Sequence, residues 1–358
     1  MVMSGTMRDL MRVACAFVVA GVAAGALPSM EYAYTSFATP APQRAAEFMA
    51  HYFGATQLKP SEFITRHGGE NNNVTATGVR FTTNANASHD VYFVDDTDGA
   101  AALLRYFHET HRFDLQEHWD WFMDWHLCFN VDDMDLASHR LVADGVPIVT
   151  RSSSFYVEVP DGITVQFLSS GAGGEYVWTE AFNFCRTTGA ASLASAPQDM
   201  ALKPPPDPLP PMPEVLPGHH SFFSTTPTLG RDALLALGAD LYNTSGVFAS
   251  THRYGDGTCA LLEWLQLPDF QIHFVDQFRK YEGAGRSVAD VEALLEAAHG
   301  DMAAYDAFMN NRVGFRVADV AAYRAALAAA ALPYLDRGPG ALLLELPGGI
   351  ILELFEGG

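Results

Sequence analysis

The chain has 358 residues, of which 49% are hydrophobic, and a formal net charge of −21 at pH 7. This length and apolar content suffice for two ordinary domains. The negative charge argues against a nucleic-acid partner, whose phosphates need a basic surface, and against docking on an anionic membrane. We interpret the acidity as a contribution to solubility.

Residues 1–26 have the pattern of a signal peptide. Arg8 and Arg12 precede an apolar run over 13–26, and Ala24-Gly25-Ala26 fits a small-residue cleavage site. The run is too short and too rich in Ala and Gly to predict a stable membrane span. We therefore expect a protein of the secretory pathway or a secreted protein. A signal anchor and an organelle-targeting leader are the alternatives.

The first elements after the leader alternate between strand and helix patterns. An apolar strand is expected at 32–38, and Pro42 then opens a helix. Gly54 is placed to end that helix. Further strands are expected near 73–83 and 89–94, so this stretch forms a first module.

Residues 99–125 are rich in histidine and tryptophan. We expect a connecting helix packed with aromatic side chains, and a pocket lid lined by Trp119, Trp121 and Trp125 is the functional alternative. The stretch His108-Glu109-Thr110-His111 is not the zinc motif H-E-x-x-H, because its second histidine follows one residue too early.

A second module follows in the order strand, helix, strand, strand, strand. Residues 126–131 alternate and predict a strand. Asp133 or Asp135 can cap a helix that runs to about residue 143, which Gly145 ends. Three short strands are then expected at 147–150, 154–159 and 163–168, the last two joined by the turn Pro160-Asp161-Gly162.

The chain is an internal duplication around a linker. Residues 186–217 are rich in Ala, Ser and Pro, which is typical of an extended linker. Beyond it, Phe129, Val131 and Asp133 recur as Phe315, Val317 and Asp319 at a constant offset of 186. Each half therefore holds two modules.

The second module resembles a module of the vicinal oxygen chelate superfamily, which includes glyoxalases, bleomycin-resistance proteins and extradiol dioxygenases. The resemblance rests on H-x-x-F-x-V-x-D at 126–133, A-x-G-V at 143–146 and P-D-G at 160–162. It implies an α+β protein of four βαβββ modules in two paired-module, glyoxalase-like domains. We expect these domains at 27–185 and 218–358.

The resemblance also implies where the functional side chains lie. In this superfamily, side chains of the first and last strand of each module project into a cup of strands. The corresponding positions of the first half are Tyr34, Tyr92, His126 and Gln166. Those of the second half are His220, His273, Arg312 and Glu353, with His219 replacing His220 if the strand register slips by one.

The two sets differ in chemistry. The set of the first half contains no carboxylate. Its cup is expected to bind a substrate through hydrogen bonds and aromatic faces, and a cup filled by its own side chains is the alternative. In the second half, His220, His273 and Glu353 suit Fe(II), and would also hold Zn, Mn or Ni. Arg312 conflicts with a metal at that place. Either it clamps an acidic substrate, or it pairs with Glu353 and no metal binds.

Two functions follow from these sets. The first is a divalent-metal-dependent lyase, isomerase or dioxygenase acting on a small molecule in the second half, with Glu353 and Arg312 as catalytic residues. The second is a metal-free small-molecule binding or sequestering module of the bleomycin-resistance type, which would use the aromatic residues of the first half. The sequence leaves a homodimer open.

Overall fold

The computed structural model describes fourteen stretches of the chain. They are residues 27–67, 70–82, 88–95, 126–151, 154–160, 163–169, 204–224, 227–241, 247–253, 259–267, 270–276, 312–329, 334–346 and 350–357. The expected leader, the stretch 99–125 with its three tryptophans, and linker residues 186–203 lie outside them and stay predictions. Within the described residues, no helix is both long and apolar enough to cross a membrane.

The first module begins with the expected strand and helix. Proline at the start of the helix costs no hydrogen bond, because an N–H in the first turn, which proline lacks, would have no acceptor within the helix. Gly54 follows with a left-handed φ of 73° and ends the helix. The elements are β1 (Glu31–Thr39), α2 (Pro42–Tyr52), β2 (Thr56–Gln57), β3 (Ser61–His67), β4 (Glu70–Thr82) and β5 (Ser88–Asp95).

The second module follows the expected boundaries closely. The Asp133 side chain accepts a hydrogen bond from the Leu136 backbone N–H at 2.8 Å and thus caps the helix. Gly145, with φ 77°, ends it. The elements are β6 (His126–Val131), α5 (Met134–Ala143), β7 (Val149–Arg151), β8 (Ser154–Val159) and β9 (Ile163–Ser169).

The second half repeats this order. The offset of 186 carries the first residue of β6 onto that of β15, and the start of α5 onto that of α11. The third module consists of β10 (Val215–Ser224), α7 (Pro227–Ala236), β11 (Asp240–Leu241), β12 (Val247–Arg253), β13 (Cys259–Gln266) and β14 (Gln271–Asp276). The fourth consists of β15 (Arg312–Val317), α11 (Val320–Ala329), β16 (Tyr334–Asp336), β17 (Ala341–Leu346) and β18 (Ile350–Glu356).

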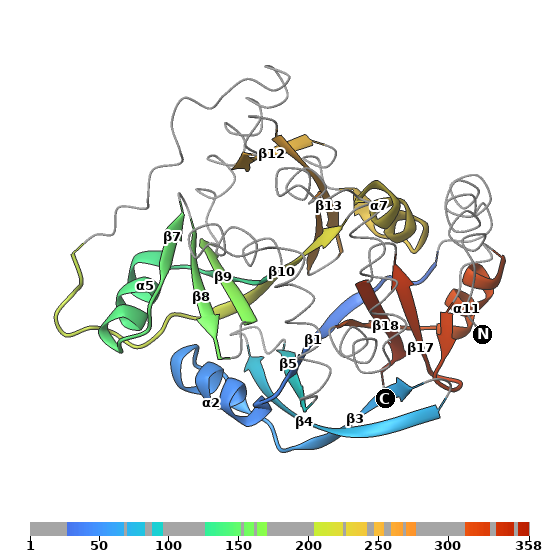
Figure 1. The fold of residues 1–358 in the computed structure, drawn as a ribbon, viewed down its shortest axis with the longest axis horizontal. Helices are drawn as coiled ribbons and strands as arrows, with labels where there is room; N and C mark the ends of the chain where they lie inside the picture. The colour runs from blue at the N-terminus through green and yellow to red at the C-terminus, as the bar shows by residue number, and fades with distance from the viewer. Residues whose placement is uncertain are drawn as a thin grey trace, which may run out of the picture.

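The modules form two sheets, and each sheet combines modules from both halves. Sheet A has the order β16-β17-β18-β15-β1-β5-β4-β2, with β3 on β4, and joins the first module to the fourth. Sheet B has the order β11-β13-β14-β10-β6-β9-β8-β7, with β12 on β13, and joins the second module to the third. In Figure 1 the blue to teal strands β1, β5 and β4 accordingly belong to the same sheet as the red strands β17 and β18, with β15 between β1 and β18.

This architecture agrees with the expected α+β class and with paired modules. The grouping, however, differs from the expected domains at 27–185 and 218–358. The seams are antiparallel pairs between first strands, β1 with β15 and β10 with β6. Because every module offers the edge of a similar first strand, the repeated sequence does not say which two modules pair.

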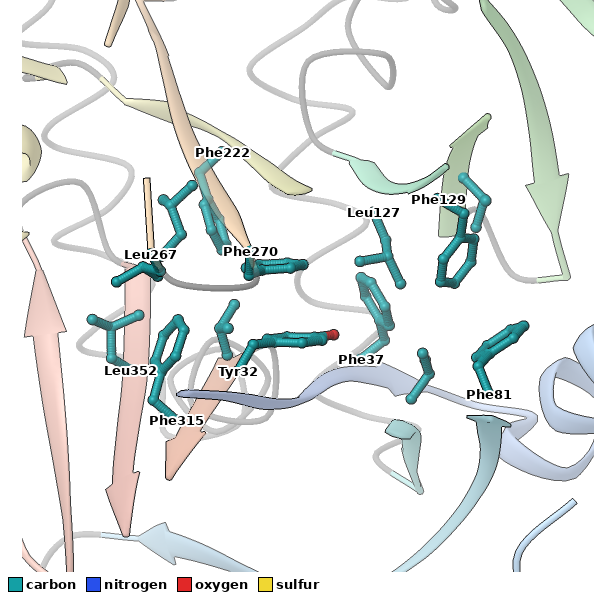
Figure 2. Packing of buried hydrophobic residues seen from close by; sticks show 14 of the residues in the cluster. Tyr32, Phe37, Phe81, Leu127, Phe129, Phe222, Leu267, Phe270, Phe315 and Leu352 are labelled. Carbon is teal, nitrogen blue, oxygen red and sulfur yellow. The ribbon is translucent and has the colours of Figure 1, made fainter. Parts of the chain in front are cut away.

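The two sheets share one hydrophobic core that is rich in aromatic rings. Tyr32 of sheet A stacks on Phe270, which precedes β14 of sheet B, with ring centroids 3.8 Å apart, as Figure 2 shows. Phe81 and Phe129 meet across the same boundary at 4.7 Å. All four rings are at most 3% exposed. Burial of such large apolar surfaces stabilises the contact between the sheets.

Candidate functional site

Two strand irregularities decide which side chains lie at the centre of each sheet. The pairing register shifts between Tyr32 and Tyr34 in β1, and between Pro217 and His219 in β10. After these shifts Tyr34 lies opposite Gly314, and His219 lies opposite Cys128. Gly314 and Cys128 are equivalent at the offset of 186, so the structural counterpart of Tyr34 is His219.

The expected position His220 is therefore off by one residue, and the alternative His219 is the one at the site. Neighbouring residues of a strand point to opposite faces, so a step of one residue exchanges the two environments. His220 is fully buried. Its ring centroid lies 5.7 Å from that of Phe37 in sheet A and 4.0 Å from that of Phe222. It belongs to the core between the sheets.

Sheet B gathers three imidazoles, which with one amide we call the histidine cluster. The Nε2 atoms of His126 and His219 are 2.9 Å apart. The ring of His219 stacks on that of His273, with centroids 3.9 Å apart. The members come from β6, β9, β10 and β14 and are His126, Gln166, His219 and His273.

The fourth member of this cluster is held by a neighbouring tyrosine. Gln166 is buried and donates from Nε2 to the Tyr156 hydroxyl at 2.7 Å. The Tyr156 ring in turn meets the His126 ring edge to face at 5.6 Å. Because the amide nitrogen is engaged by Tyr156, the carbonyl oxygen is the atom that Gln166 can offer as a ligand or acceptor.

Two histidines of this cluster, His219 and His273, have lowered pKa values. Burial lowers the pKa of His219 well below its usual value, and the nearby imidazoles of His273, His126 and His220 lower it further. Burial, with His126 and His220, likewise lowers the pKa of His273. The contact between His126 and His219 requires one nitrogen with a proton and one with a lone pair, so the two rings share a single hydrogen there.

Sheet A carries a different group at the equivalent positions, the ion-pair cluster of Tyr34, Tyr92, Arg312 and Glu353. Arg312 Nε lies 3.0 Å from Glu353 Oε2 and donates to the Tyr34 hydroxyl at 3.0 Å. The Tyr34 hydroxyl also donates to Glu353 Oε2. A Cβ at position 314 would lie 2.0 Å from the Tyr34 ring, so glycine there makes room for the ring.

The tyrosines of the ion-pair cluster stay protonated at neutral pH. Burial raises the pKa of Tyr34 well above its usual value, and it raises the pKa of Tyr92 to about 12. The Tyr92 hydroxyl donates to Asp90 Oδ2 at 2.9 Å. Arg80 holds the same carboxylate with two hydrogen bonds, at 2.7 and 2.8 Å. These phenols can therefore act as donors.

The expected metal set of His220, His273 and Glu353 is separated by the fold. Glu353 lies in sheet A, whereas both histidines lie in sheet B. Glu353 is paired with Arg312, as one of the two accounts of that arginine required. A guanidinium 3.0 Å from the carboxylate repels a divalent cation, so the ion-pair cluster does not fit a metal.

The histidine cluster fits a transition metal by its donor chemistry, since neutral imidazole is the common ligand of Zn, Ni and Fe. Its rings, as placed, do not all converge. His273 Nε2 lies 3.2 Å from Gln271 Oε1. Across the described stretches, no three His, Cys, Asp or Glu side chains are arranged to hold a metal together.

Three residues near the histidine cluster were missed in the sequence. Cys128 lies opposite both Gln166 and His219 in the strand register and is fully buried. Burial raises the pKa of its thiol, so the sulfur stays protonated. Its spacing of two from His126 would have placed it on the same face. Tyr156 and Gln271 act through side-chain contacts, which strand alternation does not predict.

No protein-family model and no curated protein sequence matches the chain. Among solved structures, a “putative dioxygenase” from Bacillus subtilis is similar, with 13% identity and a TM-score of 0.49 over 92% of this chain and 86% of its own. A glyoxalase I point mutant from Zea mays has 10% identity and a TM-score of 0.46, over 92% and 94%.

A lactoylglutathione lyase from Agrobacterium tumefaciens covers one part only, 38% of this chain and 92% of its own, with 17% identity and a TM-score of 0.23. The likeness of this chain to these glyoxalase- and dioxygenase-type structures has a TM-score below 0.5 in each case. At these identities and scores no residue role passes from them to this chain.

Proposed function

We propose that the protein is a divalent-metal-dependent enzyme of the vicinal oxygen chelate type, and that the histidine cluster is its centre. The observation that supports this most is the meeting of His126 and His219, whose ring nitrogens come from different modules and lie 2.9 Å apart. The proposal moves the centre from the second half of the chain to the seam between the second and third modules.

The metal would be held by His126 and His219, with His273 as the third ligand and the Gln166 carbonyl oxygen as the fourth. A set of imidazoles with one amide suits Zn or Ni better than Mn, which prefers carboxylate oxygen. It also lacks the carboxylate of the facial triad that Fe(II) oxygenases use. We therefore favour a lyase or isomerase over a dioxygenase.

When bound, such a metal supplies Lewis acidity to a carbonyl or to vicinal oxygens of a small molecule. The residues of the chain prepare this place. Burial keeps His219 and His273 neutral, so their lone pairs are available at neutral pH. Tyr156 holds Gln166 by its nitrogen. The hydrogen shared by His126 and His219 must move to the Nδ1 atom of its own ring before both Nε2 atoms can bind a metal.

The metal content of the full chain tests this proposal. The protein is purified without chelator and compared with His219→Ala and with Glu353→Gln as the matched control from the other cluster. We expect about one equivalent of Zn or Ni in the wild type and in Glu353→Gln, and a loss in His219→Ala.

Circular dichroism checks that the three proteins are equally folded. Metal retained in a folded His219→Ala variant and lost from Glu353→Gln would return the centre to sheet A. No metal in the wild type, even after incubation with Zn, Ni, Mn and Fe(II), would overturn the proposal. It would favour the metal-free binding module, for which the aromatic and charged side chains of the ion-pair cluster are the support.

A further inference from the structure

Two glutamines form a row that leads to His273. Gln266 ends β13 and Gln271 begins β14, and the two are partners in the antiparallel register. His273 follows Gln271 by two residues, so both side chains leave the strand on the same face. The three side chains are joined by two hydrogen bonds, Gln271 to Gln266 and His273 to Gln271.

The backbone of the turn after β13 fixes the orientation of the first glutamine. Gln266 Nε2 contacts the carbonyl oxygens of Leu267 and Phe270, the latter at 3.4 Å. A carbonyl oxygen only accepts hydrogen bonds, so the amide nitrogen of Gln266 must occupy this place, and its oxygen must face the other way.

The orientation of the second glutamine follows from the first. Gln271 Nε2 lies 2.8 Å from Gln266 Oε1 and donates to it. The Gln271 oxygen is therefore the atom that lies 3.2 Å from His273 Nε2. Since an amide oxygen only accepts, the hydrogen of this contact belongs to His273 Nε2. A neutral imidazole carries one N–H, so Nδ1 then holds the lone pair.

We propose that Gln266 and Gln271 are positioning residues that hold His273 in the Nε2–H tautomer, so that Nδ1 is its nitrogen for binding a metal or accepting a proton. The metal part of this inference rests on the proposed function, whereas the tautomer is a property of the metal-free protein. His273 thereby differs from His126 and His219, which meet through Nε2.

The tautomer is measured on the full, metal-free chain labelled with ¹⁵N-histidine, by long-range ¹H–¹⁵N spectra. His273→Asn identifies the signals of that ring. We expect the Nε2–H pattern in the wild type and a mixture of tautomers in Gln271→Leu. We expect the same mixture in Gln266→Leu. This variant does not alter His273 or Gln271 chemically, but it removes the acceptor that fixes the Gln271 amide, so that the amide can rotate by about 180°.

Two further variants make this measurement decisive. Gln271→Glu is expected to keep the Nε2–H pattern, because a carboxylate only accepts. Gln43→Leu is the control: it removes a glutamine of α2 whose Nε2 contacts Glu47 at 2.8 Å on the surface, and it should change nothing. An Nδ1–H pattern in the wild type, or an unchanged pattern in a folded Gln266→Leu variant, would overturn the inference.

Zn²⁺ affinity, measured by competition with a chromogenic chelator, separates this inference from the proposed function. Loss of a residue that orients a ligand weakens metal binding by roughly 10- to 100-fold, and we expect this for Gln266→Leu and Gln271→Leu. Wild-type protein that binds Zn²⁺ but shows the Nδ1–H pattern would refute the inference alone. Failure of the wild type to bind Zn²⁺ would refute the proposed function, with the tautomer still decided by the spectra.

Discussion

The histidine cluster and the ion-pair cluster occupy equivalent positions of the same fold but differ in their charged groups. In sheet A the centre holds a cation that belongs to the chain, the guanidinium of Arg312, already matched by Glu353. In sheet B the centre holds three imidazoles, of which His219 and His273 have lowered pKa values, and no carboxylate among its four members. The duplication thus places four side chains at equivalent positions of each sheet, and the residue types decide whether the cluster contains an ion pair.

This contrast predicts that loss of the Arg312 side chain causes a large decrease in the free energy of unfolding. Arg312→Leu leaves Glu353, which is 13% exposed at its side chain, without its cation in a largely buried place. Breaking such a pair by removing one partner costs about 3–5 kcal/mol in the free energy of unfolding. Denaturation by urea measures this value.

The matched control is Arg316→Leu, since Arg316 pairs with Glu31 at 3.2 Å but both side chains are about half exposed, at 46% and 59%. An exposed ion pair contributes roughly 0–1 kcal/mol. Equal losses for the two variants would mean that the ion-pair cluster is not a buried charge system.

The histidines predict a loss of stability in mild acid. His219 and His273 have lowered pKa values in the fold, and burial lowers the pKa of His89, which lies between the sheets, to about 4. The unfolded chain binds these protons near pH 6.5, whereas the folded chain does not. Stability is therefore complete above about pH 6.5 and falls as the pH drops towards 4.

The free energy of unfolding at pH 7.5 and pH 5 measures this effect. Among the residues that the structure describes, neither nitrogen of His89 has a hydrogen-bond partner. Its ring stacks on that of Phe81 with centroids 5.0 Å apart, so His89→Phe should make the protein less sensitive to acid. His51→Gln, at an exposed position of α2, is the control. A pH dependence that His89→Phe leaves unchanged would contradict this assignment.

A smaller effect is expected on proton release. Because the hydrogen that His126 and His219 share between their Nε2 atoms can move to the Nδ1 atom of its own neutral ring, binding of Zn²⁺ at pH 7.5 should release close to no proton from the pair. Calorimetry in two buffers of different ionisation enthalpy measures the number. Glu353→Gln should leave this number unchanged, and release of one or more protons would show that the rings are not two neutral imidazoles before the metal binds.

Much of the local structure was determined by the sequence. Strand β6, the cap at Asp133 and the end of α5 at Gly145 occur as expected, because they depend on residues within a few positions of one another. The offset of 186 also predicted α11 from α5. Alternation and capping are local, so a single sequence carries them.

The make-up of the site was decided by the tertiary structure alone. Arg312 meets Tyr34 across 278 residues of sequence, and which first strand a module pairs with depends on the packing of the whole chain. Whether His219 or His220 faces the cluster depends on a register shift in β10, which the residue pattern did not predict. A one-residue shift exchanges the two faces of a strand. The sequence therefore allowed either histidine to face the cluster, and the strand pairing in the sheet determines that it is His219.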